Sequence, residues 1–342
     1  MSRYKVFNHN NILVNVFIPS YNRAHYLPQA IESVLLQTHQ NYHIIIVDDA
    51  STDGAADVAR QFSKKYPERI TAICKKDNSG LCDSLNRALI LCKPGEYFAF
   101  LADDDIWLSD KLEKQISYLL RDPSIGLVCS DAKIIDANGE PTGQLFSERH
   151  GKFREYAQNV PRQLFLRGNF ICATSVVVTF DAIASFGFHI PSKVGFTTDY
   201  YMWLAISSKY GVRYIEKPLT LYRRSNSSVS NKFRSQLRRE AYFLLQEAYA
   251  RFEGIRRVVS PSEANNHFES LAYRYALDSL RDKSLANYLW FFAKLLQKKA
   301  NLLTLGRLYR DTKDEIRKQR SAKRAVAIQR VAQTSAREID KP

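Results

Sequence analysis

The chain has 342 residues and a formal net charge of +15, with 45% hydrophobic and 25% charged residues. This composition is typical of an ordinary globular protein, and it excludes the collagen-like, wholly disordered and disulfide-scaffold classes. The length suits one large α/β domain with an appendage, or two ordinary domains.

The first 140 residues alternate strand-like with helix-like segments. Short β-branched or aromatic runs bounded by turn or polar residues predict four strands, over residues 14–19, 43–49, 71–75 and 97–101. Helical spacing between and after them predicts helices over 27–35, 57–62, 85–91 and 109–120. Such alternation favours a mostly parallel sheet covered by helices on both faces, with ligands at the carboxyl ends of the strands.

The pattern changes after residue 125. Strands are predicted over 126–130 and 175–180, with a loop-rich stretch over 136–167 between them, then a helix over 198–210 and a short segment, 212–222. From residue 232 the pattern is helical. Two amphipathic stripes stand out there: Leu237, Ala241, Leu244, Leu245, Ala248 and Phe252, and then Leu285, Tyr288, Leu289, Phe292, Leu295 and Leu296. We expect the last twenty polar residues to be frayed or disordered.

The positive charge is concentrated in the last third of the chain. Residues 1–222 carry 24 Lys+Arg and 23 Asp+Glu, whereas residues 223–342 carry 26 and 12, a net charge of +14. Two interpretations remain open. The basic region is either a solubilising helical surface or a contact with an anionic partner, such as lipid headgroups or nucleic acid.

Acidic residues follow two of the predicted strands. Asp103, Asp104 and Asp105 come after the fourth strand, and such a cluster repels itself unless a cation or several hydrogen-bond donors neutralise it. One interpretation is a site for a hard divalent ion, whose coordination is completed by substrate phosphates. The other is that these aspartates only form an acidic first turn ahead of the next helix. Asp48 and Asp49 end the second strand, where a carboxylate can accept from a base or ribose hydroxyl or can brace the turn.

Several enzyme classes lack their motifs in this sequence. Neither Gly-x-Gly-x-x-Gly nor the P-loop pattern occurs, the seven histidines show no metal-ligand spacing, and there is no Gly-x-Ser-x-Gly. These observations argue against dehydrogenases, P-loop kinases, zinc hydrolases and serine esterases. The five cysteines show no Cys-x-x-Cys spacing, which predicts reduced cytosolic thiols.

Taken in order, the motifs resemble family 2 glycosyltransferases of the GT-A fold over about residues 14–230. The blocks that carry the resemblance are VNVFIPSYNR from residue 14, QT at 37–38, IIIVDDASTD from 44, NSG at 78–80 with LN at 85–86, GEY at 95–97, and TDYYMWL from 198. Any single block is only suggestive, whereas several blocks in this order are highly specific. The resemblance implies a mixed, mostly parallel α/β sheet flanked by helices, with a C-terminal helical extension.

The resemblance also implies a donor site and a metal site. The donor nucleotide would be bound by Pro19, Ser20, Tyr21, Arg23, Asp49, Asn78, Asp103 and Arg223. In this arrangement Asp49 accepts from the base and Asp103 holds the ribose. Asp104 or Asp105 would bind Mg²⁺ or Mn²⁺, because Ala102 stands where the family often has the first aspartate and leaves that choice open. Such an ion stabilises the diphosphate leaving group.

Asp199 matches the aspartate that serves as catalytic base in the family, with Thr198 in place of the usual preceding Glu. A carboxylate there could take the proton of an acceptor hydroxyl, or it could simply cap the helix that follows. Arg223 or Arg224 would clamp phosphate, and Ser225 replaces a frequent His.

The resulting hypothesis is an inverting, metal-dependent enzyme that moves a hexosyl or related sugar from a nucleotide-diphosphate donor, a UDP-sugar by family habit. The acceptor would be a hydroxyl of a glycan or lipid-linked molecule in cell-surface polysaccharide synthesis. The alternatives are a sugar nucleotidyltransferase and a non-enzymatic basic nucleic-acid-binding protein, but nucleic acid is not the expected partner because the body of the chain is neutral.

The expected organisation is a GT-A domain over residues 1–235 and a basic helical region over 236–342. We expect this second region to dock on an anionic membrane surface or to form homo-oligomers. No apolar run approaches the ~20 residues of a membrane span, and the first ten residues lack a signal-peptide core. The expected location is therefore the cytoplasm, peripheral on the inner face of the plasma membrane.

Overall fold

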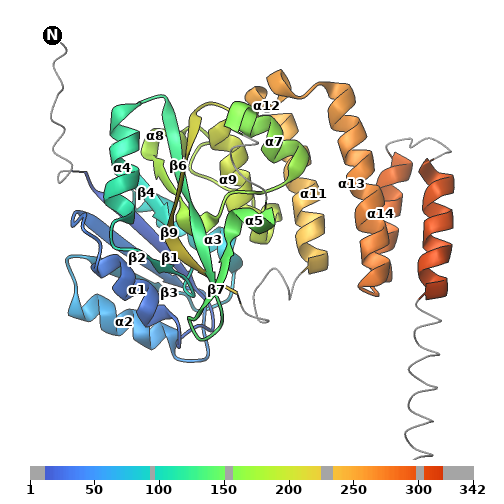
Figure 1. Ribbon diagram of the computed structural model, residues 1–342. Helices are drawn as coiled ribbons and strands as arrows, with labels where there is room; N and C mark the ends of the chain where they lie inside the picture. Colours follow the sequence, from blue (N-terminus) through green and yellow to red (C-terminus); the bar gives the residue numbers. More distant parts are fainter. Residues whose placement is uncertain (1–11, 93–96, 151–156, 225–233, 298–303, 319–342) are drawn as a thin grey trace, which may run out of the picture. The chain divides into compact units, whose positions relative to one another are not determined.

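The structure is a computed structural model that describes residues 12–92, 97–150, 157–224, 234–297 and 304–318 (Figure 1). The chain divides into two compact units, Met1–Val259 and Ser260–Pro342. The first unit contains the sheet, and the described part of the second is helical.

The N-terminal half of the first unit alternates strands and helices as predicted. Its elements are β1 (Val14–Ser20), α1 (Leu27–Leu35), β2 (Tyr42–Asp48), α2 (Ala55–Lys65), β3 (Ile70–Cys74), α3 (Gly80–Ile90) and β4 (Tyr97–Phe100). The strands lie in the order β3-β2-β1-β4 and all pair in parallel. Their carboxyl ends therefore share one edge of the sheet, where Figure 1 shows them side by side.

The sheet continues with mixed pairing beyond β4. Five further strands join it: β5 (Ile106–Trp107), β6 (Ile125–Ile135), β7 (Pro141–Leu145), β8 (Val177–Thr179) and β9 (Gly211–Arg223). The full order is β3-β2-β1-β4-β8-β6-β9-β5, with β7 paired to β6. Strand β8 is antiparallel to both its neighbours, whereas β6 and β9 are parallel to each other. Antiparallel β9 holds β5 directly after the acidic cluster.

The two faces of the parallel strands are covered by different helices. Val14, Val16 and Ile18 of β1 face α1, α2 and α4 (Lys111–Arg121), and they share a core with the buried residues of those helices. Phe17 points to the opposite face, where its ring lies 6.2 Å from that of Phe98. Burial on both faces explains why β1 and β2 are almost continuous runs of apolar residues.

The stretch 136–167 has more regular structure than the predicted loops. It contains β7, α5 (Phe146–His150), the 3₁₀ turn η2 (Ala157–Asn159) and α7 (Val160–Arg167). The side chain of Asn159 caps α7 by accepting from the amide of Arg162 at 3.3 Å. The segment predicted over 212–222 is the long strand β9, whose pairing with β6 is interrupted over residues 216–219, around Pro218.

The end of the first unit is helical and well buried. Further short elements, η3 (Ala173–Ser175), α8 (Phe180–Ala184) and η4 (Ser192–Thr197), lead to α9 (Thr198–Ser207), which is buried on all sides after its first turn. Helices α11 (Arg234–Arg251) and α12 (Glu253–Val258) pack against η4 and α7. Helix α11 buries Tyr242, Leu244 and Leu245, and the first compact unit ends at Val259.

The second unit contains α13 (Pro261–Arg281), α14 (Leu285–Gln297) and a helix over residues 304–318. Ser260 and Glu263 form a capping box at the start of α13. The predicted stripe of α14 divides in the structure: Leu295 is buried, as is Phe291 beside the stripe, whereas Leu285, Leu289 and Leu296 are exposed. The last twenty residues lie outside the described residues.

The cysteines and the helices bear on two predictions from the sequence. All five cysteine thiols are free. Among the described residues, no helix has both the length and the apolarity that a membrane crossing needs.

Candidate active site

The predicted donor-binding residues lie at or shortly after the carboxyl ends of strands that meet at one edge of the sheet. The amide of Asp49 donates to the carbonyl oxygen of Ser20 at 2.8 Å, which joins the turn after β2 to the turn after β1. The amide of Tyr21 donates to Asp103 Oδ2 at 3.2 Å, which joins the β1 turn to the acidic cluster after β4. The structure therefore brings three of the quoted motifs together.

The turn after β1 presents an aromatic ring to solvent. Ser20 is buried and Pro19 is half-buried, whereas the side chain of Tyr21 is 49% exposed. Asn22 turns the chain with a φ of 53°, in the left-handed region that Asn tolerates better than most residues. Its amide donates to Ser51 Oγ at 2.9 Å, so the turn is also held to the loop after β2.

The three carboxylates after β4 have different surroundings. Burial, with the neighbouring charge of Asp104, raises the pKa of Asp103 to about 8, although the Tyr21 amide opposes this shift. Burial also raises the pKa of half-buried Asp104, against the charge of Arg23, whose Nε lies 3.9 Å from Asp104 Oδ2. Asp105 is buried, and loss of water raises its pKa well above the usual range. A cation would relieve this repulsion.

Arg223 is buried, and its donors are directed to protein oxygens. Its amide donates to Asp105 Oδ1 and its Nε to the carbonyl oxygen of Asp104, both at 2.7 Å. The guanidinium also donates to Gln29 Oε1 at 2.9 Å and to two carbonyl oxygens of the β6–β7 turn at 3.2 Å, and it stacks on the ring of Tyr26. Arg223 is only 3% exposed, and its hydrogen bonds to Asp104 and Asp105 hold the acidic cluster in position.

Asp49 shapes the loop that leads into α3. Its Oδ1 accepts from the amide of Ser79 at 2.9 Å, and its Oδ2 accepts from the amide of Gly80 at 2.8 Å. The buried ammonium of Lys75 lies 2.6 Å from the same carboxylate. Asn78, the preceding residue, is exposed at the rim of this loop. Asp49 therefore fixes the position of the block that carries Asn78.

Asp199 lies in the first turn of α9. Asn169 Nδ2 donates to Asp199 Oδ2 at 2.9 Å. Loss of water raises the pKa of Asp199 to about 6, although the hydrogen bond from Asn169 and the amide of Tyr200 oppose the shift. The carboxylate is therefore ionised at neutral pH, yet is basic enough to accept a proton.

The phenol of Tyr222 is influenced by both groups of carboxylates, the acidic cluster and Asp199. Burial raises the pKa of its phenol, and the charges of Asp105, Asp104 and Asp199 add to that shift. The acidic cluster and the predicted base therefore both act electrostatically on the residue before Arg223. Sequence spacing alone could not place these groups around one ring, because they are almost 100 residues apart.

Comparisons with known proteins identify the family. The sequence pattern described as Glycosyl transferase family 2 matches residues 15–183. A Bacillus subtilis protein named as a teichuronic acid biosynthesis glycosyltransferase, TuaG, is 31% identical over 237 residues, which cover 69% of this chain and 88% of that protein. The chain belongs to the family 2 glycosyltransferases. A second relative, WfgD of Escherichia coli, is 32% identical over 234 residues, covering 68% of this chain and 85% of WfgD.

Solved structures confirm that this glycosyltransferase has the GT-A fold. Residues 1–349 of Staphylococcus aureus TarS, solved with UDP, align with a TM-score of 0.51 at 16% identity, over 84% of this chain and 92% of that one. The mannosyltransferase PcManGT of Pyrobaculum calidifontis, solved with GDP-Man and Mn²⁺, aligns with a TM-score of 0.54 at 17% identity, over 86% and 78%. Family membership favours sugar transfer over nucleotidyl transfer and over a non-enzymatic nucleic-acid-binding role.

The acidic cluster of the glycosyltransferase suits an ion that is completed by substrate. Within the described ranges, no three His, Cys, Asp or Glu side chains form a site that could hold a metal ion. Asp104 is half-buried, whereas Asp105 is 1% exposed and its Oδ2 has no hydrogen-bond partner. Carboxylate oxygens are the ligands that Mg²⁺ and Mn²⁺ prefer, and phosphate oxygens usually complete such sites. The donor set therefore fits a divalent ion.

Three residues of the site were not predicted. Lys75 follows the end of β3, so the strand-end rule that selected Asp49 could also have selected it. Asn169 lies in a segment without a periodic signal, and only the fold places it against Asp199. Gln29 lies on the helix after β1, and its contact with Arg223 spans 194 positions.

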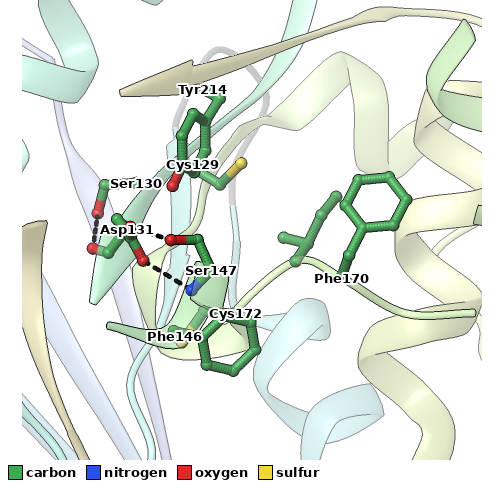
Figure 2. Close-up of a pocket in the computed structure, with 9 residues that line it drawn as sticks. Cys129, Ser130, Asp131, Phe146, Ser147, Phe170, Cys172 and Tyr214 are labelled. Carbon is green, nitrogen blue, oxygen red and sulfur yellow. Dashed lines mark hydrogen bonds between the residues drawn. The ribbon is translucent and has the colours of Figure 1, made fainter. Parts of the chain in front are cut away.

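A separate small pocket lies between β6, α5 and the loop before η3 (Figure 2). Its lining residues are Cys129, Ser130, Asp131, Phe146, Ser147, Phe170, Ile171, Cys172 and Tyr214. Asp131 Oδ2 accepts from Ser147 Oγ at 2.6 Å, and Oδ1 accepts from the amide of Ser147 at 3.1 Å. As Figure 2 shows, both oxygens of this carboxylate are used to hold α5 to β6. The polar residues of this pocket therefore have a structural role, which is to attach α5 to the sheet.

Proposed function

We propose that this glycosyltransferase moves a sugar from a UDP-sugar to a hydroxyl of a glycan or lipid-linked acceptor, with inversion, in cell-surface polysaccharide synthesis. The names of the relatives support this class: TuaG is named for teichuronic acid biosynthesis, and WfgD as a UDP-Glc:alpha-D-GlcNAc-diphosphoundecaprenol beta-1,3-glucosyltransferase. The TarS structure with UDP supports the choice of nucleotide, although PcManGT was solved with GDP-Man.

The observation that carries the proposal is the arrangement of carboxylates around Tyr222. The acidic cluster adjoins Tyr21 and Arg23 at the strand ends, and the charge of Asp199 acts on the same Tyr222 phenol as the charges of Asp104 and Asp105. A sugar transfer needs these two functions close together, one for the leaving diphosphate and one for the attacking hydroxyl.

In the donor half, each residue has a proposed role. The exposed ring of Tyr21 stacks on the nucleobase, Asp103 accepts from the ribose, and Arg23 attracts the diphosphate. Asp104 would hold Mg²⁺ or Mn²⁺, because the Asp105 carboxylate is only 1% exposed. When bound, the divalent ion neutralises charge that develops on the departing diphosphate. We assign to Arg223 the positioning of Asp104 and Asp105, in place of the predicted phosphate contact.

In the acceptor half, Asp199 takes the proton of the attacking hydroxyl. Asn169 donates to one oxygen of this carboxylate and so fixes its orientation. The other oxygen is then available to the acceptor. Direct attack on the anomeric carbon by a hydroxyl on the side opposite the diphosphate inverts the configuration, and no covalent intermediate with the enzyme forms.

The donor proposal is tested by thermal shift with a panel of nucleotides. UDP and UDP-sugars are expected to raise the melting temperature in the presence of Mn²⁺, and GDP or GDP-mannose much less. Asp104→Asn is expected to reduce the effect of Mn²⁺ on UDP binding, while the same substitution at exposed Asp57 leaves it unchanged. A larger shift with GDP than with UDP would overturn the choice of nucleotide, and not the choice of site.

We further propose that the enzyme works at the inner face of the plasma membrane, attached through its basic C-terminal region. Residues 223–342 carry the +14 charge, and anionic lipid attracts basic residues with ~1 kcal/mol each near the surface. Such attachment would bring the site to a lipid-linked acceptor.

A further inference from the structure

Helix α14 has an exposed face made only of apolar residues. Leu285, Leu289 and Leu296 are 63%, 53% and 51% exposed, and half-buried Phe292 lies between them. Their spacing of four, three and four residues places them on one side of the helix. Exposed Ala286 and Ala293 fall on the same side, which therefore has no polar group along its centre.

The other sides of α14 are occupied within its own unit. Phe291 and Leu295 are buried, and the ring of Phe291 lies 5.4 Å from that of Tyr275 on α13. Tyr288 hydrogen bonds to Thr312 of the helix over 304–318, at 3.2 Å. The two neighbouring helices thus use two flanks of α14 and leave the leucine face without cover in the described part of the unit.

The sequence of α14 and of the residues that follow it is predominantly basic. Helix α14 contains no Asp or Glu, and its only charged residue, Lys294, lies against the ring of Trp290 at 5.1 Å. The sequence continues with Lys298 and Lys299, and residues 285–342 contain 14 Lys+Arg and five Asp+Glu. A helix with an apolar face, an aromatic ring and flanking basic residues is typical of elements that lie in the interface of an anionic bilayer.

We propose that the leucine face of α14, defined by Leu285, Leu289, Phe292 and Leu296, inserts into the headgroup region of an anionic membrane. This inference rests on the proposed function, because membrane contact would give the enzyme access to a lipid-linked acceptor. Helix α14 would be the element that makes the contact. A second copy of the chain fits less well, because it would bring together two copies of the segment 285–342, each with 14 Lys+Arg against five Asp+Glu.

Vesicle co-sedimentation of the full chain tests this assignment. Wild-type protein is expected to bind phosphatidylcholine vesicles that contain phosphatidylglycerol, to bind pure phosphatidylcholine weakly, and to lose binding as salt rises. Leu289→Asp is expected to weaken binding about tenfold or more, because it places a carboxylate in the inserted face. The matched control is Leu36→Asp, which changes a leucine of 73% exposure just after α1 and should not alter binding.

The outcomes separate this inference from the catalytic proposal. Equal vesicle binding by wild type and Leu289→Asp overturns the role of α14, as does equal wild-type binding to neutral and anionic vesicles. A dimer that Leu289→Asp dissociates, with vesicle binding unchanged, assigns the face to a second copy and also overturns it. The thermal shift of the same proteins with UDP and Mn²⁺ is measured in parallel. If UDP with Mn²⁺ produces no thermal shift in the wild-type protein, the donor proposal is refuted, whereas the vesicle-binding result still holds.

Discussion

At the scale of single residues, Asp199 has the properties that a general base needs. Its pKa of about 6 means that it is ionised at neutral pH and protonated in mild acid. Because a base must be unprotonated to accept, we expect the transfer rate to fall about tenfold per pH unit below pH 6. The rate profile with a saturating donor measures this pKa. A rate that stays flat down to pH 4.5 would assign the base to a group of lower pKa.

The raised pKa of Asp199 also predicts an effect on the free energy of unfolding. The folded-state pKa lies above the ordinary value, so the protonated form favours folding and this contribution disappears as the pH rises through about 6. At pH 7.5 we therefore expect Asp199→Asn to stabilise the fold, by up to about 2–3 kcal/mol. Denaturant titration of both proteins at pH 7.5 and pH 4.5 checks the sign, since the difference should shrink in acid. Asp57→Asn, on the surface, serves as the control.

Arg223 and Arg224 are adjacent but have different environments. Arg223 is buried among carbonyl and carboxylate oxygens, whereas Arg224 is exposed. Lysine cannot reproduce the planar fork of arginine, so Arg223→Lys should cost about 3 kcal/mol in unfolding free energy and weaken UDP binding with Mn²⁺. Arg224→Lys should leave stability unchanged. Weaker UDP binding by Arg223→Lys without any loss of stability would instead favour a direct phosphate contact.

At the scale of secondary structure, sequence patterns located the elements that are defined locally. The buried runs of β1 and β2 and the helices between them have clear periodicities, and their strand-end residues could be named in advance. The contacts of Arg223 could not, because its guanidinium reaches Gln29 across the fold. The apolar stripe of α14 was visible, but which leucines pack and which are exposed depends on α13 and on the helix over 304–318.

Helix α12 offers a test of how the first unit ends. A Cβ at Gly254 would overlap the carbonyl oxygen of Ser208, a backbone atom that cannot move aside easily. Gly254→Ala should therefore destabilise the unit by about 2–4 kcal/mol. Gly306→Ala, in the helix over 304–318, meets no atom within 4 Å and should stabilise by up to about 1 kcal/mol. Thermal unfolding of both variants measures the contrast. A neutral effect of Gly254→Ala would mean that α12 is loosely docked.

At the scale of the whole molecule, the basic charge does not coincide with one unit. Residues 223–259 carry nine Lys+Arg and three Asp+Glu and belong to the first unit, whereas residues 260–342 carry 17 and nine. The net charge of the sequence therefore changes near residue 222, whereas the first compact unit ends at Val259. Both the last helices of the glycosyltransferase unit and the second unit present basic residues, while the acidic groups cluster at the strand ends.

In the proposed reaction, Asp199 takes the proton from the acceptor while the acidic cluster holds the donor. The most direct measurement is transfer of labelled sugar from a UDP-sugar to a lipid-linked glycan acceptor by wild type and by Asp199→Asn, with UDP binding measured on both. We expect Asp199→Asn to bind UDP with Mn²⁺ as wild type does and to transfer sugar about 10²–10⁴-fold more slowly. Transfer by Asp199→Asn at the wild-type rate would show that Asp199 is not the base.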